Sequence, residues 1–172
     1  MKYETTSSKL ADFGRLLLTK KSIVEGLPHI SKYAKDVINA QRCSIFIYDA
    51  KTKDLWTTIA DGVEKIVVSD KNGVVGQTIK EKKPLIENDP YSNPKFLQEI
   101  DKKTGFVTQN LITSPIFNSK REVIGVMELL NKTGGFDLED SKFMIFFAHY
   151  ISGFLELINL YELKEEKNKN DE

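Results

Sequence analysis

The chain has 172 residues, 40% hydrophobic and 29% charged, the balance of an ordinary globular domain with a substantial core. Its 25 basic and 25 acidic residues cancel, so net charge gives no reason to expect nucleic acid or an anionic membrane surface as a partner. The single cysteine excludes an internal disulfide, and two histidines far apart in sequence form no metal-ligand cluster.

The start of the chain, "MKYETTSSKLADF", lacks the apolar segment of a secretory signal. No apolar run reaches the ~18 residues of a membrane span. We therefore expect a cytoplasmic protein, or a cytoplasmic part of a larger one, without membrane insertion, bound metal or nucleic acid.

The first helical pattern places leucines and a phenylalanine at helical spacing over residues 10–17, with Ser7 or Ser8 as the N-cap. We assign residues 1–20 to a linker or dimerisation helix, residues 21–165 to the globular domain and residues 166–172 to a charged tail.

A second helical pattern covers residues 23–38. Ser22 and Glu25 suit a capping box, but Pro28 would then fall past the first turn. The regular part of this helix is therefore also compatible with a start nearer Leu27.

The period of the pattern changes to two at Cys43, which predicts strands. "CSIFIYDA" and "LWTTIA" form a hairpin around the polar turn "KTKD", and "DGVEKIVVS" supplies a third strand. Alternation puts Cys43 and Ile45 on one face and Ser44 and Phe46 on the other. Later, "QNLITSPIF" and "EVIGVMELLN" predict two strands joined by "NSKR".

Between these strand groups lies a connection of about 25 residues that is long for a mere link. Asn72 and Gly73 suit the start of a short buried helix that ends before Pro84, and "PLIEN" is briefly extended. Asn93 as N-cap and Pro94 at the first helical position predict another short helix. Such a segment often closes over a binding site.

The last helix is predicted from about Asp137 to about Glu165, with an unusually wide apolar surface. Either it is simply well buried, or it covers the sheet on one side and pairs with another subunit on the other; we favour the second interpretation. Hairpin strands with helices gathered elsewhere predict an α+β fold with an antiparallel sheet.

The stretch "NKTGGFDLED" resembles the NKFD signature of GAF domains, the sensor modules of cyclic-nucleotide phosphodiesterases and adenylyl cyclases. The matching residues are Asn131, Lys132, Phe136 and Asp140, whereas Ser141 replaces the usual Glu. "RCSIFIYD", "NGVVGQTI", "PYSNPKF", "TGFVTQNLITSPI" and "VIGVMELLNK" resemble further blocks of the cyclic-nucleotide-binding subgroup, in order.

This resemblance implies a GAF fold, with about six antiparallel strands, terminal helices on one face and a ligand pocket under the short helices on the other. It also implies that the motif braces the pocket, with Lys132 and Asp140 paired across the turn and Phe136 filling the space beneath. A simpler interpretation, helix punctuation with Asp137 as N-cap, is compatible with it.

Ligand contacts are likewise implied by the resemblance. The amides of Val74 and Val75, at a helix start, would face a cyclic phosphate, which suits the helix dipole. Thr104 and Thr108 would contact the ligand through their hydroxyls, with Asp101 supporting them. Without the family resemblance, the pattern at Val74 and Val75 indicates only an ordinary helix start, and Thr104 and Thr108 are expected to be solvated.

Further positions are expected to lie near the base. By the resemblance, Ser44 would point into the pocket, and the backbone of Asp61 would meet the purine. The preceding family position is commonly aromatic but is Ala60 here, which costs a stacking contact of about 1–3 kcal/mol. Glu128 interrupts an apolar strand; it either faces the pocket, accepting from Thr108 or a purine N–H, or lies on the solvent face of an edge strand.

We therefore predict a regulatory domain that binds cAMP or cGMP and signals through its terminal helices, as a homodimer, to an output domain or protein. The alternative is a GAF dimerisation module with no nucleotide or a different ligand, which Ala60 and Ser141 favour. We expect no enzyme activity, catalytic residue or cofactor, because Cys43 is alone and inside a strand. Haem ligation by His29 or His149 has little support, since lone helical histidines are more often structural.

Overall fold

The computed structural model describes residues 2–20, 23–60 and 65–170, and side chains over 8–20, 25–57 and 65–157. Five α-helices, six strands and one 3₁₀ helix lie within these ranges. In chain order they are α1 (Lys2–Leu18), α2 (Ile23–Ile38), β1 (Ala40–Asp49), β2 (Asp54–Ala60), β3 (Val67–Ser69), α3 (Gly73–Glu81), β4 (Leu85–Glu87), η1 (Pro90–Ser92), α4 (Gln98–Thr104), β5 (Leu111–Phe117), β6 (Val123–Lys132) and α5 (Leu138–Asn170).

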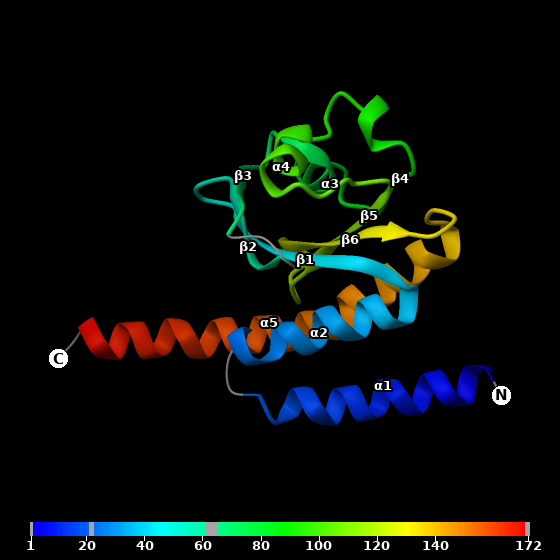
Figure 1. Ribbon diagram of the computed structural model, residues 1–172. Coiled ribbons are helices and arrows are strands. Elements are labelled where there is room, and N and C mark those ends of the chain that lie inside the picture. Colours follow the sequence, from blue (N-terminus) through cyan, green and yellow to red (C-terminus); the bar gives the residue numbers. More distant parts are fainter. Residues whose placement is uncertain (1, 21–22, 61–64, 171–172) are drawn as a thin grey trace.

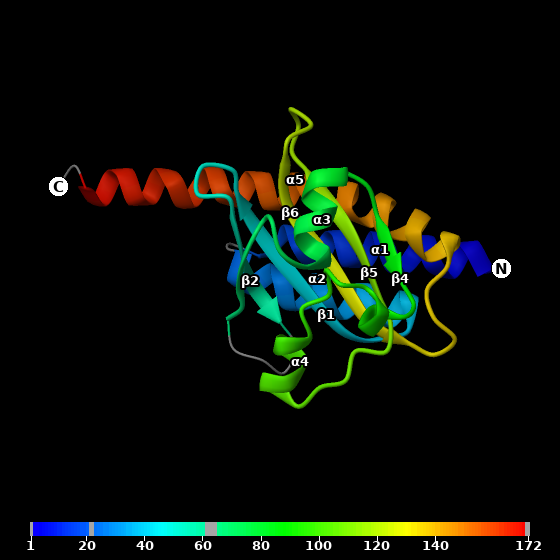
Figure 2. The same cartoon turned by 90° about the horizontal axis from the view of Figure 1, so that it is seen from above.

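A six-stranded antiparallel sheet of order β3-β2-β1-β6-β5-β4 forms the middle layer. Figure 1 shows α2 and α5 against one face of this sheet, with α1 beyond them, and α3 and α4 over the opposite face. Seen from above in Figure 2, α3 lies over the middle of the sheet and α4 lies toward one side of it. The predicted α+β architecture, with terminal helices on one face and short helices on the other, is confirmed.

The helix-covered face carries the main core, because β1, β5, β6, α2 and α5 all turn apolar side chains into it. From the sheet come Cys43, Ile45, Met127 and Leu129, all fully buried. On the helix side, the ring of Phe147 lies 5.6 Å from that of Phe13, so α1 packs onto α5. The terminal helices are therefore part of the folded domain.

One helix start differs from the sequence prediction, and a second decides between the two alternatives that the sequence left open. The first helix begins at Lys2, so Ser7 and Ser8 lie inside it and not at its N-cap. The second begins at Ile23 and contains Pro28, which stands five residues after the start. Packing of the amphipathic helix against the sheet outweighs the local cost of proline here. Ser22 lies outside the described residues.

The prediction that Asn93 caps a helix is wrong. The Asn93 side chain accepts from the Lys95 N–H at 2.9 Å and donates to Glu87 at 2.9 Å, while the Phe96 N–H bonds to the Asn93 carbonyl at 3.0 Å. These bonds close a turn, which delays the helix until Gln98.

The last helix extends past its predicted end, through most of the predicted charged tail, to Asn170. Lysine and glutamate in "KEEKNKN" are good helix formers, which accounts for the extension. Within the described parts of the chain, no helix combines the length and apolarity that crossing a membrane would need.

Candidate functional site

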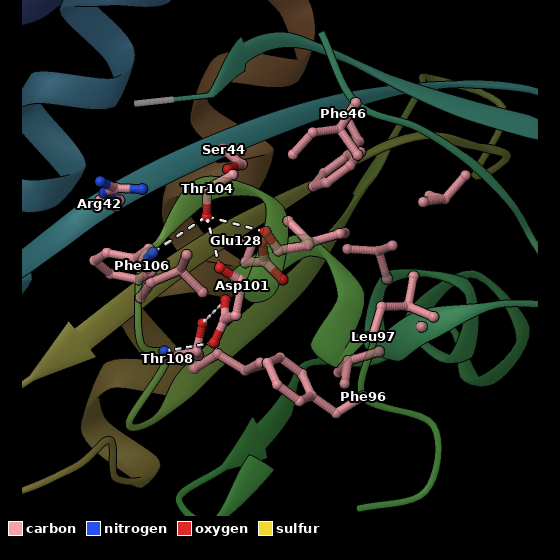
Figure 3. A pocket seen from close by; sticks show the side chains of 18 residues that line it. Arg42, Ser44, Phe46, Phe96, Leu97, Asp101, Thr104, Phe106, Thr108 and Glu128 are labelled. Carbon is pink, nitrogen blue, oxygen red and sulfur yellow. Dashed lines mark hydrogen bonds between the residues drawn. The ribbon is translucent and has the colours of Figure 1, made fainter. Parts of the chain in front are cut away.

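A cavity of about 70 Å³ lies between the sheet and the short helices α3 and α4. Its floor comes from β1, β5 and β6, one side from the edge strand β3, and its roof from the α3 start, the α4 segment and the loop that follows. Figure 3 shows these side chains converging on one space. The lining residues are Arg42, Ser44, Phe46, Ile66, Val68, Gly73, Val74, Val75, Phe96, Leu97, Ile100, Asp101, Thr104, Phe106, Thr108, Leu111, Glu128 and Leu130.

The floor follows from strand alternation in β1 and β6. Cys43 and Ile45 point into the helix-side core, which turns Ser44 and Phe46 toward the cavity side. Ser44 pairs directly with Glu128 in β6 and with Ala60 in β2. The prediction that Ser44 faces the pocket is therefore confirmed as geometry.

Glu128 faces the cavity, which decides between the two sequence interpretations. Its neighbours Met127 and Leu129 are fully buried in the helix-side core, and β6 lies in the interior of the sheet, not at an edge. Within the described chain no group donates a hydrogen bond to the Glu128 carboxylate. Burial, and secondarily the negative charge of Asp101, raise the pKa of Glu128 to about 7.

Asp101 organises the loop that follows α4. Its carboxylate accepts from the Thr108 N–H at 2.7 Å, from the Thr108 hydroxyl at 2.8 Å and from the Tyr91 hydroxyl at 2.7 Å. The predicted support of Thr108 by Asp101 is confirmed, but Thr108 donates to Asp101 and not to Glu128. The Thr108 hydroxyl proton is thus already engaged.

Thr104 lines the cavity, but its hydroxyl donates to its own helix, to the Ile100 carbonyl at 3.0 Å. The same oxygen accepts from the Phe106 N–H at 3.3 Å. Thr104 therefore ends α4 and shapes the turn, with acceptor capacity left for a ligand.

The start of α3 forms another part of the wall. Gly73, Val74 and Val75 line the cavity, and the first backbone bond of the helix is from the Gly76 N–H to the Asn72 carbonyl at 3.2 Å. Asn72 makes no capping bond through its side chain, as far as the described residues show. The first N–H groups of α3 are thus not satisfied by a capping side chain, which leaves the helix start suited to an anion.

The motif turn is braced as predicted. The Lys132 ammonium contacts both carboxylate oxygens of Asp140, at 2.7 and 2.6 Å, and Phe136 is buried in the helix-side core. Asp137 also caps α5: its carboxylate accepts from the Glu139 and Asp140 N–H groups at 2.8 and 3.0 Å, while Asp140 accepts from the Asp137 N–H at 2.9 Å. Both sequence interpretations of the motif therefore hold together.

Asn131 connects the motif to the cavity wall, a link that the sequence did not reveal. Its side-chain oxygen accepts from the Gln109 N–H at 2.7 Å, and its amide donates to the Val107 carbonyl at 2.9 Å. Nearby, the Asn110 side chain accepts from the Lys132 N–H at 2.8 Å and donates to the Lys132 carbonyl at 3.0 Å. The motif thereby holds the loop that carries Thr108.

Sequence reasoning missed Arg42 and Phe106. The Arg42 guanidinium carbon lies 3.8 Å from the centroid of the Phe106 ring, at one end of the cavity. Arg42 is two residues before Ser44, so strand periodicity alone would have placed it on the same face. The orientation of Phe106 could not be predicted from periodicity, because this residue lies in an irregular loop after a helix. Asp61 lies outside the described residues, and of Ala60 only the backbone is described.

The groups considered for other chemistry lie away from the cavity. The Cys43 side chain is fully buried in the helix-side core. His29 is on α2, and His149 is on α5, where its ring contacts the Ile145 carbonyl at 2.8 Å. Among the described residues, no cluster of histidine, cysteine and acidic side chains could hold a metal.

Comparison with known proteins identifies the family. The family model described as GAF domain matches residues 23–154. The chain belongs to the GAF domain family, as the motif and the two-sided sheet predicted.

A curated relative is the probable 3',5'-cyclic phosphodiesterase pde-5 of Caenorhabditis elegans. It is 26% identical over 148 residues, which is 77% of this chain but 20% of the relative. The chain thus spans about a fifth of the length of that relative.

Two structures share the fold. The GAF domain of a phosphoenolpyruvate-protein phosphotransferase from Coxiella burnetii has a TM-score of 0.78 at 14% identity, covering 90% of this chain and 94% of its own. The free methionine-R-sulfoxide reductase from Neisseria meningitidis, in complex with its substrate, has a TM-score of 0.75 at 16% identity. The match covers 88% of this chain and 89% of the reductase chain. The fold is therefore shared by proteins of different activities.

Proposed function

We propose that this GAF domain is a regulatory sensor that binds a cyclic nucleotide, cAMP or cGMP, in the cavity under α3 and α4. The observation that carries the proposal is the meeting of two unlike groups in one space: the α3 start and the Glu128 carboxylate, which within the described residues have no capping side chain and no hydrogen-bond donor, respectively. The first suits a cyclic phosphate and the second suits an N–H group of a purine. Similarity to a probable cyclic phosphodiesterase supports the same ligand class.

Size adds a condition to this proposal. Small-molecule sites commonly have volumes of about 300–1,000 Å³, whereas this cavity has about 70 Å³. A cyclic nucleotide therefore requires the α4 segment to move outward. The backbone at Gly105, with φ of +70°, ends α4 beside Phe106 and is a natural place for that movement.

Binding is tested by isothermal titration calorimetry of the whole chain with cAMP and with cGMP. We expect saturable heat for at least one of them and a loss of affinity of tenfold or more in Glu128→Gln, since the amide replaces one acceptor oxygen with a donor. Glu122→Gln, on the exposed β5–β6 turn, is the matched control. Absence of both heat and thermal shift at millimolar nucleotide contradicts the proposal.

Signal output in this proposal uses the terminal helices, through a homodimer that acts on an output domain or partner protein. Apolar side chains remain exposed along α1 and α5: Leu16, Leu18, Ile145, Phe146, Tyr150 and Leu157. This surface also supports the second candidate function, a dimerisation module without a nucleotide. In either case the pairing of helices is the common element.

Light scattering tests the dimer with Phe146→Asp, because Phe146 is 51% exposed whereas Phe147 is fully buried. We expect the variant to be monomeric and folded. Lys142→Asp, at another exposed position of α5, is the control. An unchanged dimer would locate the interface elsewhere.

We also propose that the domain has no catalytic activity of its own. The one thiol of the chain faces the helix-side core, on the opposite side of β1 from the cavity. Reduction of free methionine sulfoxide by this chain, measured with a coupled thioredoxin assay, should therefore stay at background; turnover that Cys43→Ser abolishes would contradict this.

A further inference from the structure

Arg42 occupies an unusual position in the cavity wall. Among the described residues that line the cavity, it is the one with a positive charge. Its guanidinium carbon lies 3.8 Å from the Phe106 ring centroid, a distance that places the group directly over the ring face. Figure 3 shows Arg42 and Phe106 at one end of the cavity, Phe46 and Leu97 at the other, and Ser44, Asp101 and Glu128 between them.

The other rings of the cavity wall are already packed. Phe46 is almost completely buried in a small cluster that includes Leu55 and Val75, next to α3. Phe96 packs edge-on against Tyr91, with 5.3 Å between ring centroids. Neither is therefore well placed to offer a free face near Glu128.

A guanidinium is planar, delocalised and weakly hydrated, so it stacks on aromatic rings with one face while the other remains available. Nucleobases stack on arginine planes as they do on aromatic side chains. Because Phe106 fixes one face of Arg42, the orientation of the plane is set before a ligand arrives, which lowers the entropic cost of stacking.

We propose that Arg42, held on Phe106, is a specificity-determining residue whose guanidinium plane stacks against the purine of the ligand. This inference rests on the proposed function and adds that two groups of the protein recognise the base. Glu128 meets the N–H edge of the base, and Arg42 covers its face. A saturated ligand, which has no π-face, loses the second contact and binds more weakly.

The experiment compares Arg42→Lys and Arg42→Ala with wild type, by calorimetry with cAMP, cGMP, adenosine and guanosine. Lysine keeps the charge and loses the plane, so stacking predicts a weakening of about tenfold or more in both variants. Arg121→Lys, the same exchange on the exposed β5–β6 turn, is the matched control. Thermal unfolding of each variant shows that it is folded.

A second measurement reads the contact directly. The chain has three arginines, Arg15, Arg42 and Arg121, so side-chain Nε–H signals are readily assigned by substitution in nuclear magnetic resonance spectra. We expect the Arg42 signal to shift on binding and to show an intermolecular Overhauser effect to the base. A merely structural clasp between Arg42 and the Phe106 loop would change stability but give no such effect.

The outcomes separate this inference from the proposed function. Nucleotide binding that Arg42→Lys leaves unchanged overturns the role of Arg42 and keeps the sensor. Nucleoside binding that depends on Arg42, without cyclic-nucleotide binding, keeps the role of Arg42 and overturns the ligand class. Absence of any purine binding overturns both.

Discussion

The two faces of the sheet are built from the same strands but have different roles, one in the apolar core and the other in the cavity. On the helix side, Cys43 and Ile45 of β1 join a large apolar core with α2 and α5. On the other side, Ser44 of the same strand borders a cavity with two carboxylates, Asp101 and Glu128. Close apolar packing stabilises the first face, whereas polar groups that the protein satisfies only in part shape the second. Stability and binding are thus separated across one layer of backbone.

The largest expected effect tests the helix-side face. Phe147 is fully buried and stacks near Phe13, Tyr33 and Phe143. Phe147→Ala should lower the free energy of unfolding by about 3–5 kcal/mol through the lost burial and the cavity left behind. Denaturant unfolding measures the change, and Phe146→Ala is the control because that ring is half exposed. Equal losses in the two variants would mean that α5 is packed differently.

A somewhat smaller effect is expected where the motif holds the cavity wall. Asn131→Ala removes the bonds to the 107–110 loop and places alanine at a φ of +58°, for a loss of about 3 kcal/mol. Asn39→Ala, the same exchange at a φ of +63° in an exposed turn, isolates the backbone cost. Hydrogen exchange should accelerate over residues 107–110 in the first variant. Unchanged exchange there would show that Asn131 is no brace.

The pH dependence of stability tests the cavity face. The pKa of Glu128 is raised to about 7, so the folded protein binds this proton more tightly than the unfolded chain between about pH 4.5 and 7. The free energy of unfolding should therefore fall as pH rises through this window, by about 2 kcal/mol after allowing for solvation through the cavity. Thermal unfolding from pH 4.5 to 8 measures it.

In Glu128→Gln this part of the pH dependence should disappear, and the variant should be more stable than wild type at pH 8. Glu122→Gln, the same exchange on the exposed β5–β6 turn, is the control. A slope that survives in Glu128→Gln would assign the titration to a group other than Glu128.

The smallest effect concerns the roof. Tyr91→Phe removes the 2.7 Å bond to Asp101 from an exposed tyrosine, and should lower the free energy of unfolding less than the preceding substitutions. Because the bond ties η1 to α4, hydrogen exchange should accelerate over residues 98–108 and not in β1. Acceleration spread over the whole sheet would show that the roof and the helix-side core unfold as one unit.

Local patterns determined much of the fold. The hairpin of β1 and β2, the α3 start at Gly73 and the Lys132–Asp140 pair all follow from residues near one another in sequence. The α+β class followed from the order of such elements. These features were predictable because strand alternation, turn chemistry and helix capping act over a few residues.

Long-range contacts decided the rest of the site. Glu128 faces the cavity because β6 lies between β1 and β5, and no local pattern shows strand order. The bonds of Asn131 to the 107–110 loop and the stack of Arg42 on Phe106 each join segments far apart in the chain.

Asn93 shows that a local pattern can also mislead. Its residue type suits an N-cap, but its side chain bonds to Glu87 and forms part of a turn instead.

The sequence by itself determined which elements form and which side chains share a face. Only the tertiary structure decided which faces meet, since burial and pairing depend on neighbours that the chain brings together on folding.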